Sequence, residues 1–183
     1  MKYFLLSDIH GSVTRLDRAL AIFGRERCDM LLLLGDVLNY GPRNGLPEGL
    51  DARGVADRLN ALAGRIVAVR GNCDAEVDQM LLHFPILSTY ALLVDEGRKI
   101  LLTHGHVYHK DNLPPGQFDA VVCGHTHLWE LSDLDICGHP AIYCNTGSVT
   151  FPKNGNEPTF GILDNGQFSI RNLDNRILAE KTL

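Results

Sequence analysis

Acidic, amide and histidine side chains occur in five short clusters along the chain. The clusters contain Asp8 and His10, Asp36, Asn72, His104 and His106, and His125 and His127. Each cluster directly follows an apolar, strand-like run. Because the carboxyl ends of several strands meet at one edge of an alternating sheet, these side chains could come together at a single point. The set is large enough to bind two metal ions, so the sequence predicts hydrolytic metal chemistry.

The motif residues provide two carboxylates, one amide oxygen and four imidazoles. Each motif alone is a weak signal, since a single Asp or His near a strand end more often caps a helix or closes a turn. Residues two apart in extended backbone project to the same side, so we expect Asp8 and His10 to reach one ion. We expect the same of His125 and His127. Asp36 could bridge two ions because a carboxylate has two oxygens.

The mixture of oxygen and nitrogen ligands narrows the choice of metal. It disfavours calcium, which takes mainly oxygen ligands. It suits manganese, iron, zinc, cobalt or nickel, and we take manganese as the first candidate. Two such divalent ions about 3.5–4 Å apart can hold a phosphoryl group and generate hydroxide near neutral pH.

The length and charge of the chain limit the class of protein. A chain of 183 residues fits a single domain, which we expect to cover residues 1–183. Its 17 basic and 22 acidic residues give a net charge of −5, which argues against dedicated nucleic-acid binding. A small phosphorylated substrate stays compatible with this charge, because bound divalent metals would make the site locally positive.

The cysteines and the hydropathy pattern indicate the compartment. The five cysteines form no Cys-x-x-Cys pair, which disfavours a thiolate zinc site. Their odd number and the lack of a secretory signal predict a cytoplasmic protein with reduced thiols. No apolar run approaches the ~20 residues that a membrane span needs.

The hydrophobic pattern predicts strands and helices that alternate in the first half and short strands in the second. In the first half we expect strands at 3–6, 30–34 and 66–69, a helix capped by Ser12, a second helix at about 55–62 and a short third helix capped by Asp74. In the second half we expect strands at 91–94, 100–102, 120–123, 142–144, 160–163 and 168–170. Asn165-Gly166 predicts a hairpin between the last two of these strands.

The clusters, in this order, resemble the motifs of the calcineurin-like metallophosphoesterase superfamily. The superfamily pattern is Asp-x-His, Gly-Asp, Gly-Asn-His-Asp or Glu, His, and Gly-His-x-His. The small size of the chain, its Gly-Asn-Cys-Asp at 71–74 and the segment 39–44 are similar to compact bacterial phosphodiesterases of that superfamily. The resemblance implies an α/β fold, a four-layer sandwich in which two facing mixed β-sheets are flanked by helices.

The resemblance also implies roles for the matching residues. One ion would be bound by Asp8, His10 and His127, the other by Asn72, His104 and His125, and Asp36 would bridge them. A metal-bound hydroxide would attack phosphorus in line with the leaving oxygen, without a covalent phospho-enzyme. The implied activity is hydrolysis of a small phosphodiester.

Cys73 departs from the superfamily pattern. Many members have a histidine there, which helps to bind phosphate or protonates the leaving group. A thiol is a weak proton donor, so we expect protonation of the leaving group to be weak, or to come from His106 or water. The alternative for Cys73 is a small packing residue in a tight turn. The candidate catalytic residues are Asn72, Cys73, His104 and His106.

Arg43 and Asn44 follow the proposed bridging carboxylate in a loop at 39–53. The planar guanidinium of Arg43 could bind a substrate phosphate, and a solvated loop arginine is the alternative. We treat both residues as candidate substrate contacts. The shape of this loop and of the loop at 106–117 does not follow from the sequence.

Other functions are compatible with the same fold. The chain also resembles the retromer scaffold subunit, a non-enzymatic protein whose metal site is degenerate. A site without activity should have lost ligands, whereas all seven metal positions are filled here. A phosphomonoesterase or a nucleotide pyrophosphatase would have the same metal core. A homo-oligomer is an open alternative to a monomer.

Overall fold

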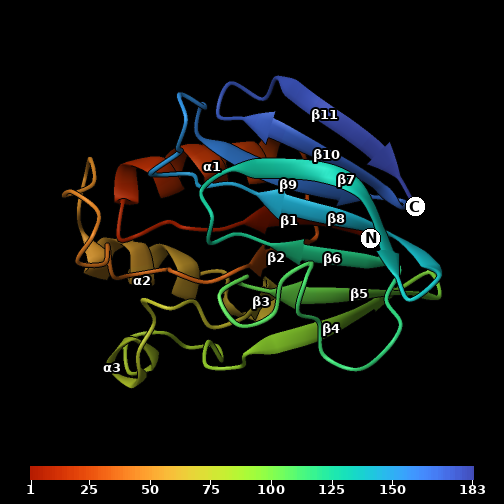
Figure 1. The fold of residues 1–183 in the computed structure, drawn as a ribbon. Coiled ribbons are helices and arrows are strands. Elements are labelled where there is room, and N and C mark those ends of the chain that lie inside the picture. Colours follow the sequence, from red (N-terminus) through yellow and green to blue (C-terminus); the bar gives the residue numbers. More distant parts are fainter.

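Two mixed β-sheets face each other in the computed structural model, which describes residues 1–183 (Figure 1). The first sheet has the order β11-β10-β9-β1-β2-β3 and the second β4-β5-β6-β8-β7. The first sheet contains β1 (Lys2–Leu6), β2 (Met30–Leu33), β3 (Ile66–Ala68), β9 (Thr159–Asp164), β10 (Gln167–Asn172) and β11 (Ile177–Thr182). The second contains β4 (Tyr90–Asp95), β5 (Arg98–Thr103), β6 (Ala120–Cys123), β7 (Trp129–Ile136) and β8 (His139–Thr146). These sheets confirm the expected fold class.

The parallel strands of each sheet end at one common edge. In the first sheet β1 pairs with β2 in parallel, and β2 pairs with β3 in the same way. In the second sheet β5, β6 and β8 are parallel neighbours. The segments that leave the carboxyl ends of these strands therefore emerge together, which is where sequence motifs with ligand-type side chains occur.

Alternation along the central strand β1 forms two separate apolar cores. Tyr3 and Leu5 pack between the two sheets, whereas Phe4 and Leu6 point to the helix side. Phe4 stacks on the ring of Phe160 with a centroid separation of 4.5 Å. Because β1 is buried on both faces, its sequence is a continuous apolar run, as parallel central strands usually are.

Helices cover only one outer face of the sandwich. The helices are α1 (Val13–Arg25), α2 (Ala52–Asn60) and the four-residue α3 (Glu76–Gln79), with a 3₁₀ turn at Ala63–Arg65. The apolar faces of α1 and α2 pack with the first sheet, while no helix lies in front of the second sheet in Figure 1. The outer face of the second sheet packs instead against Leu113 and Phe118. Pro114, Pro115 and Gly116 in that segment disfavour a helix, so the fourth layer is a loop.

The strands and the hairpin are predicted better than the edges of the sheets. Every expected strand is present within about three residues of its expected bounds, and Asn165 (φ 48°) and Gly166 (φ 80°) form the turn between β9 and β10. β7 and β11 were not predicted from the sequence. Both lie at sheet edges, and only Ile136 among their residues is buried, so the apolar alternation that identifies a strand is weak in them.

Two expected helix starts are wrong. The second helix begins at Ala52, because the side chain of Asp51 accepts a hydrogen bond from Gly54 N at 2.8 Å and caps it. The third helix begins after Ala75, and Asp74 does not cap it. The carboxylate of Asp74 is bound elsewhere, to the backbone of the loops described below.

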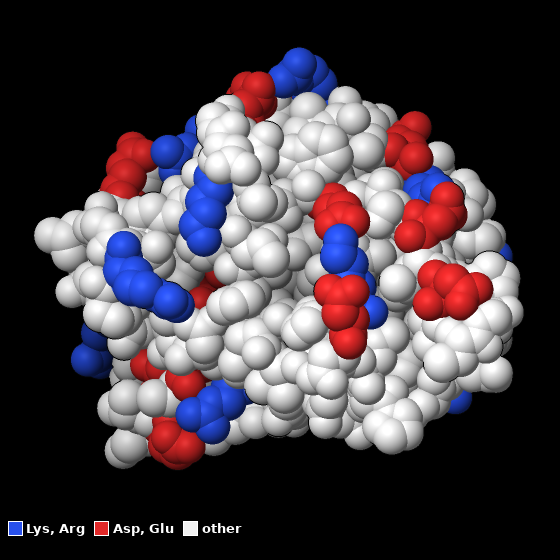
Figure 2. Space-filling model, viewed as in Figure 1, with Lys and Arg blue, Asp and Glu red and all other residues white.

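The face of the molecule drawn in Figure 2 has mixed charge. Figure 2 shows acidic and basic side chains dispersed over this face without a large basic area. None of the helices is both long enough and apolar enough to cross a membrane.

Candidate metal centre and substrate cavity

The motif residues lie at the carboxyl edge of the sheets, and most of them have an unusual backbone conformation. Five of the seven candidate ligands have positive φ angles: Asp8 58°, His10 50°, Asp36 55°, His125 70° and His127 62°. This left-handed conformation costs a non-glycine residue about 1–2 kcal/mol. Strain of this kind is usually retained where function requires it. It also corrects the expectation that Asp8 to His10 and His125 to His127 are extended.

Backbone carbonyls orient three of the imidazoles. Nδ1 of His10 lies 2.8 Å from Asn39 O, Nδ1 of His104 lies 2.6 Å from Leu34 O, and Nδ1 of His127 lies 2.7 Å from Phe151 O. A carbonyl oxygen can only accept, so each Nδ1 carries a proton and donates it. The Nε2 atom of each neutral ring is then left with a free lone pair, as in metal-binding histidines.

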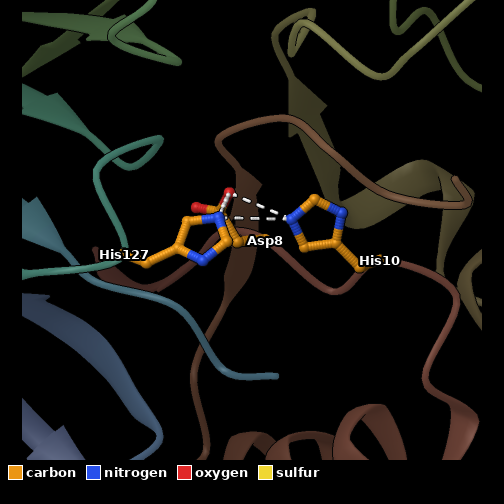
Figure 3. A group of neighbouring side chains, drawn as sticks. All are labelled: Asp8, His10 and His127. Carbon is orange, nitrogen blue, oxygen red and sulfur yellow. Dashed lines mark hydrogen bonds and ion pairs between the residues drawn. The ribbon is translucent and has the colours of Figure 1, made fainter. Parts of the chain in front are cut away.

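Asp8, His10 and His127 converge on one point (Figure 3). Oδ1 of Asp8 lies 3.1 Å from Nε2 of His127 and 3.4 Å from Nε2 of His10, and the two Nε2 atoms are 3.4 Å apart. Asp8 Oδ1 is buried and has no hydrogen-bond donor. With neutral imidazoles, three acceptor atoms face one another without a proton between them. This group therefore fits a cation.

Asp36 lies between this group and a second one. Its Oδ2 atom is 3.7 Å from Nε2 of His10 and 3.5 Å from Nε2 of His104. Nε2 of His104 is in turn 3.2 Å from the amide oxygen of Asn72. One carboxylate thus faces histidines of both groups, which is the position that a bridging ligand needs.

The site attracts positive charge. Burial alone would lower the pKa of His104, but the neighbouring Asp36 and Asp8 carboxylates outweigh it and raise the pKa to about 9. Burial likewise opposes ionisation of Asp36, yet its contact with His104 holds the carboxyl pKa below its ordinary value. A positive charge here, whether a proton or a metal ion, is stabilised by both carboxylates.

His125 and His106 lie beside the second group without a hydrogen bond to it. The ring of His125 packs edge-on against His104 at a centroid distance of 5.0 Å. Burial and the proximity of His104 lower the pKa of His125 to about 4. The ring of His106 lies 5.3 Å from that of His104, and its buried Nδ1 has no partner. Both imidazoles therefore lie beside His104, but His125 lines the cavity described below, whereas His106 lines only a neighbouring one.

Asp74, a buried motif carboxylate that the sequence placed only as a helix cap, joins two of the ligand loops. Asp74 accepts hydrogen bonds from the backbone N–H groups of Asp36 and Val37, each at 2.8 Å, and of Gly71 at 2.7 Å. A side chain at Gly71 would overlap Asp36, so only glycine fits there. Asp74 thus fixes the bridging carboxylate relative to the loop of Asn72. The sequence signal, an Asp beside Gly-Asn, was interpreted as a helix cap.

Five of the seven candidate ligands, all except Asp8 and His104, line a polar cavity of about 740 Å³. Arg43, Asn44 and Cys73, which were expected near the substrate, all line it. The amide of Asn44 donates to Tyr40 O at 2.7 Å and so closes the turn that carries Arg43. Lys153 also lines the cavity, and the sequence analysis missed it because it follows no motif.

The environment of Cys73 is that of a neutral thiol. Its backbone N–H donates to Asp36 Oδ1 at 2.8 Å, and its Sγ accepts from the amide of Asn72 at 3.2 Å. Burial, followed by the charge of Asp36, raises the pKa of Cys73 to about 12. A thiolate at this position is therefore disfavoured near neutral pH.

Comparison with known proteins gives consistent matches. The family described as the calcineurin-like phosphoesterase superfamily domain matches residues 1–167. The chain is 47% identical to Phosphodiesterase YfcE of Escherichia coli (strain K12), over 98% of this chain and 97% of that protein. It is 25% identical to Phosphodiesterase MJ0936 of Methanocaldococcus jannaschii, over 94% of this chain and 98% of that protein.

Solved structures agree with these matches. A structure described as YfcE, a phosphoesterase from E. coli, superposes with a TM-score of 0.94 at 45% identity and covers 100% of this chain and 99% of its own. A structure of wild-type Vps29 from Entamoeba histolytica complexed with Zn²⁺ covers 100% of this chain and 98% of its own. Its TM-score of 0.62 at 20% identity establishes a shared fold alone.

The left-handed backbone can be tested with a pair of substitutions at His125. Both His125→Gly and His125→Ala remove the ring, but only the alanine variant is destabilised by the positive φ angle. We expect the glycine variant to be more stable by about 1 kcal/mol in urea unfolding of the metal-free protein. His104, which does not have a positive φ, provides the control, and there alanine should be the more stable variant. The same preference at both positions would contradict the argument.

The role of Asp74 predicts a large loss of stability. Asp74→Asn replaces an acceptor oxygen with an NH₂ group that faces backbone donors. We expect the free energy of unfolding to fall by about 2–4 kcal/mol, and the affinity for Mn²⁺ measured by calorimetry to fall with it. Asp111→Asn, at an exposed position, should change stability by less than about 0.5 kcal/mol. Equal stability of the two variants would show that the Asp74 carboxylate does not stabilise the two ligand loops.

Proposed function

The chain belongs to the calcineurin-like phosphoesterase superfamily and is a metal-dependent phosphoesterase, and from this we propose that it hydrolyses small phosphodiesters at a centre of two divalent ions. The proposal includes the expected ligand sets: Asp8, His10 and His127 for one ion, Asn72, His104 and His125 for the other, and Asp36 between them. Manganese is the first candidate metal, and zinc, iron, nickel and cobalt are the alternatives.

One observation carries the proposal. Oδ1 of Asp8 is buried without a donor and faces the Nε2 atoms of His10 and His127. Their Nδ1 protons are already donated to backbone carbonyls, so no neutral arrangement satisfies all three acceptors. A protein that needed these residues only for packing would not retain this arrangement, because it costs stability when no cation is bound.

The residues of the site have separable tasks. The ions, when bound, would supply hydroxide near neutral pH and neutralise charge on the transferring phosphoryl group. Asp8 and Asp36 fix the spacing of the ligand groups, and Asp74 fixes Asp36. The carbonyls of Leu34, Asn39 and Phe151 hold their imidazoles in the ligating tautomer. Arg43 and Asn44 lie on the cavity side, where a substrate phosphate would enter.

The alternatives keep the same fold and differ in chemistry. A non-enzymatic scaffold would not need converging acceptors in a buried site, and all seven ligand positions are filled. A phosphomonoesterase or nucleotide pyrophosphatase would use the same centre, so substrate profiling decides between them and a diesterase. A single domain over residues 1–183, and either a monomer or a homo-oligomer, remain predictions.

Metal-dependent hydrolysis of bis(p-nitrophenyl) phosphate tests the proposal. We expect turnover that requires a divalent metal and is stimulated by Mn²⁺. Asp36→Asn should lower kcat by at least about 10³-fold, because the proposed bridge between the ions is weakened. Asp111→Asn should leave kcat within about twofold. Release of p-nitrophenolate is followed by its absorbance.

The alternatives predict different results in the same assay. Turnover of p-nitrophenyl phosphate but not of the diester would identify a monoesterase. An inactive wild type with every divalent metal would favour the scaffold.

Cys73 predicts a steep dependence of rate on the leaving group. A neutral thiol of low acidity protonates the departing oxygen poorly, so aryl phosphodiesters with more basic leaving groups should react progressively more slowly. Cys73→His introduces a better proton donor and should make the plot of log kcat/KM against leaving-group pKa less steep. Cys137→His, at an exposed cysteine in the turn after β7, is the control and should keep the steep plot. A flat plot for the wild type would refute the role given to Cys73.

A further inference from the structure

Two cations at the edge of the cavity have no partner within the chain. Arg43 and Lys153 both line the cavity that contains the candidate ligands, and both are exposed. Neither side chain makes an ion pair or a hydrogen bond. Lys110, which lines a neighbouring cavity, differs from them because its Nζ contacts both carboxylate oxygens of Glu130 at 3.0 Å. The charges of Arg43 and Lys153 are therefore available to a ligand.

The loops that carry these cations are the loops that orient two of the histidines. The carbonyl of Asn39, four residues before Arg43, accepts from Nδ1 of His10 at 2.8 Å. The carbonyl of Phe151, two residues before Lys153, accepts from Nδ1 of His127 at 2.7 Å. The position of each cation is thus coupled to the group formed by Asp8, His10 and His127.

Hydrogen bonds within the loops limit how far the cations can move. Oδ1 of Asn39 accepts from Gly41 N at 2.8 Å, and the amide of Asn44 donates to Tyr40 O at 2.7 Å, so both ends of the turn around Arg43 are closed. The backbone N–H of Lys153 donates to His127 O at 3.1 Å. The side chains are flexible, but their attachment points are fixed relative to the centre.

The rest of the cavity wall is polar. Of its 13 lining residues one is hydrophobic, Cys73, and none is Phe, Tyr or Trp. A nucleobase usually stacks on an aromatic side chain, and the aromatic rings that line this cavity are those of His10, His125 and His127, which are candidate metal ligands. The wall therefore fits a small, hydrophilic substrate better than a nucleotide.

We propose that the substrate is a small polar phosphodiester that carries a second anionic group, a carboxylate or a phosphate, which Arg43 and Lys153 bind. This inference rests on the proposed diesterase function. The ligand centre would compensate the charge of the phosphoryl group that is cleaved, and the two free cations are then left for a further negative charge. A carboxylate or phosphate oxygen matches the planar donors of arginine, and an ammonium group adds a point charge.

A series of p-nitrophenyl phosphodiesters tests this inference with one leaving group throughout. The second alcohol is propanol, 3-hydroxypropanoate or choline, which makes that end neutral, anionic or cationic. Hydrolysis breaks the bond between phosphorus and the p-nitrophenolate oxygen and adds water, so a single absorbance reports all three. We expect kcat/KM to be about tenfold higher for the anionic than for the neutral ester at low salt, and lowest for the cationic ester. The ratio of kcat/KM for the anionic ester to that for the neutral ester should fall towards one in 0.5 M NaCl, since exposed charges are screened.

Variants and a binding measurement separate charge recognition from other effects. In R43Q/K153Q the ratio of anionic to neutral kcat/KM should fall to about one, and each single variant should be intermediate. R25Q and K99Q, which remove exposed unpaired cations far from the cavity, should retain the ratio of the wild type. By calorimetry, 3-phosphonopropanoate should bind the Mn²⁺-loaded wild type about tenfold more tightly than propylphosphonate does. The two ligands should bind Mn²⁺-loaded R43Q/K153Q with about equal affinity.

The outcomes distinguish this inference from the function on which it rests. Equal kcat/KM for the anionic and neutral esters, with bis(p-nitrophenyl) phosphate still hydrolysed, would overturn the substrate class and leave the diesterase intact. A preference that persists in R43Q/K153Q would overturn the assignment of the two cations. Absence of hydrolysis of every diester would overturn both proposals.

Discussion

The structure depends on keeping acceptor atoms close together in a buried place. Oδ1 of Asp8 lies within 3.4 Å of Nε2 of His10 and His127, Oδ2 of Asp36 lies within 3.7 Å of Nε2 of His10 and His104, and backbone carbonyls accept from Nδ1 of each ring. The Nε2 lone pairs and the charged carboxylates repel one another in this geometry unless a proton or a metal ion lies between them. The loops, the glycines and the hydrogen bonds that Asp74 accepts maintain that geometry.

The positive φ angles of the ligand residues serve the same purpose, because they direct the side chains at the strand ends. A strand that continued past Leu6 or Leu33 would direct successive side chains to opposite faces, and a helix would direct them outward. A residue with positive φ turns the chain sharply at the strand end, and Asp8 and Asp36 there reach His127 and His104, which follow strands of the second sheet. The strain is tolerated because the strands before it are buried on both faces and cannot shift to relieve it.

The sequence predicts the elements that are governed by apolar patterns and by motifs. The buried strands and the Asn165-Gly166 turn follow from hydrophobic runs and turn chemistry, and the proximity of the ligands follows from their places at strand ends. The positive φ angles and the three backbone partners of Asp74 depend on loops that meet only in the folded chain. The edge strands β7 and β11 are missed because their polar faces dilute the pattern, and Lys153 has no motif at all.

In the function that we propose, chemistry and substrate choice are carried by different parts of the chain. The candidate ligands follow the strands of the two sheets, and their positions are fixed by the same cores that stabilise the fold. The side chains of Arg43 and Lys153 are exposed and belong to neither core, so a substitution at either position should cost little stability. Because each loop also supplies the carbonyl that orients a histidine, its backbone is constrained while its exposed side chains are free to vary. Under the proposed substrate recognition, a change of substrate on this fold would require new side chains on two loops and would leave the candidate metal ligands intact.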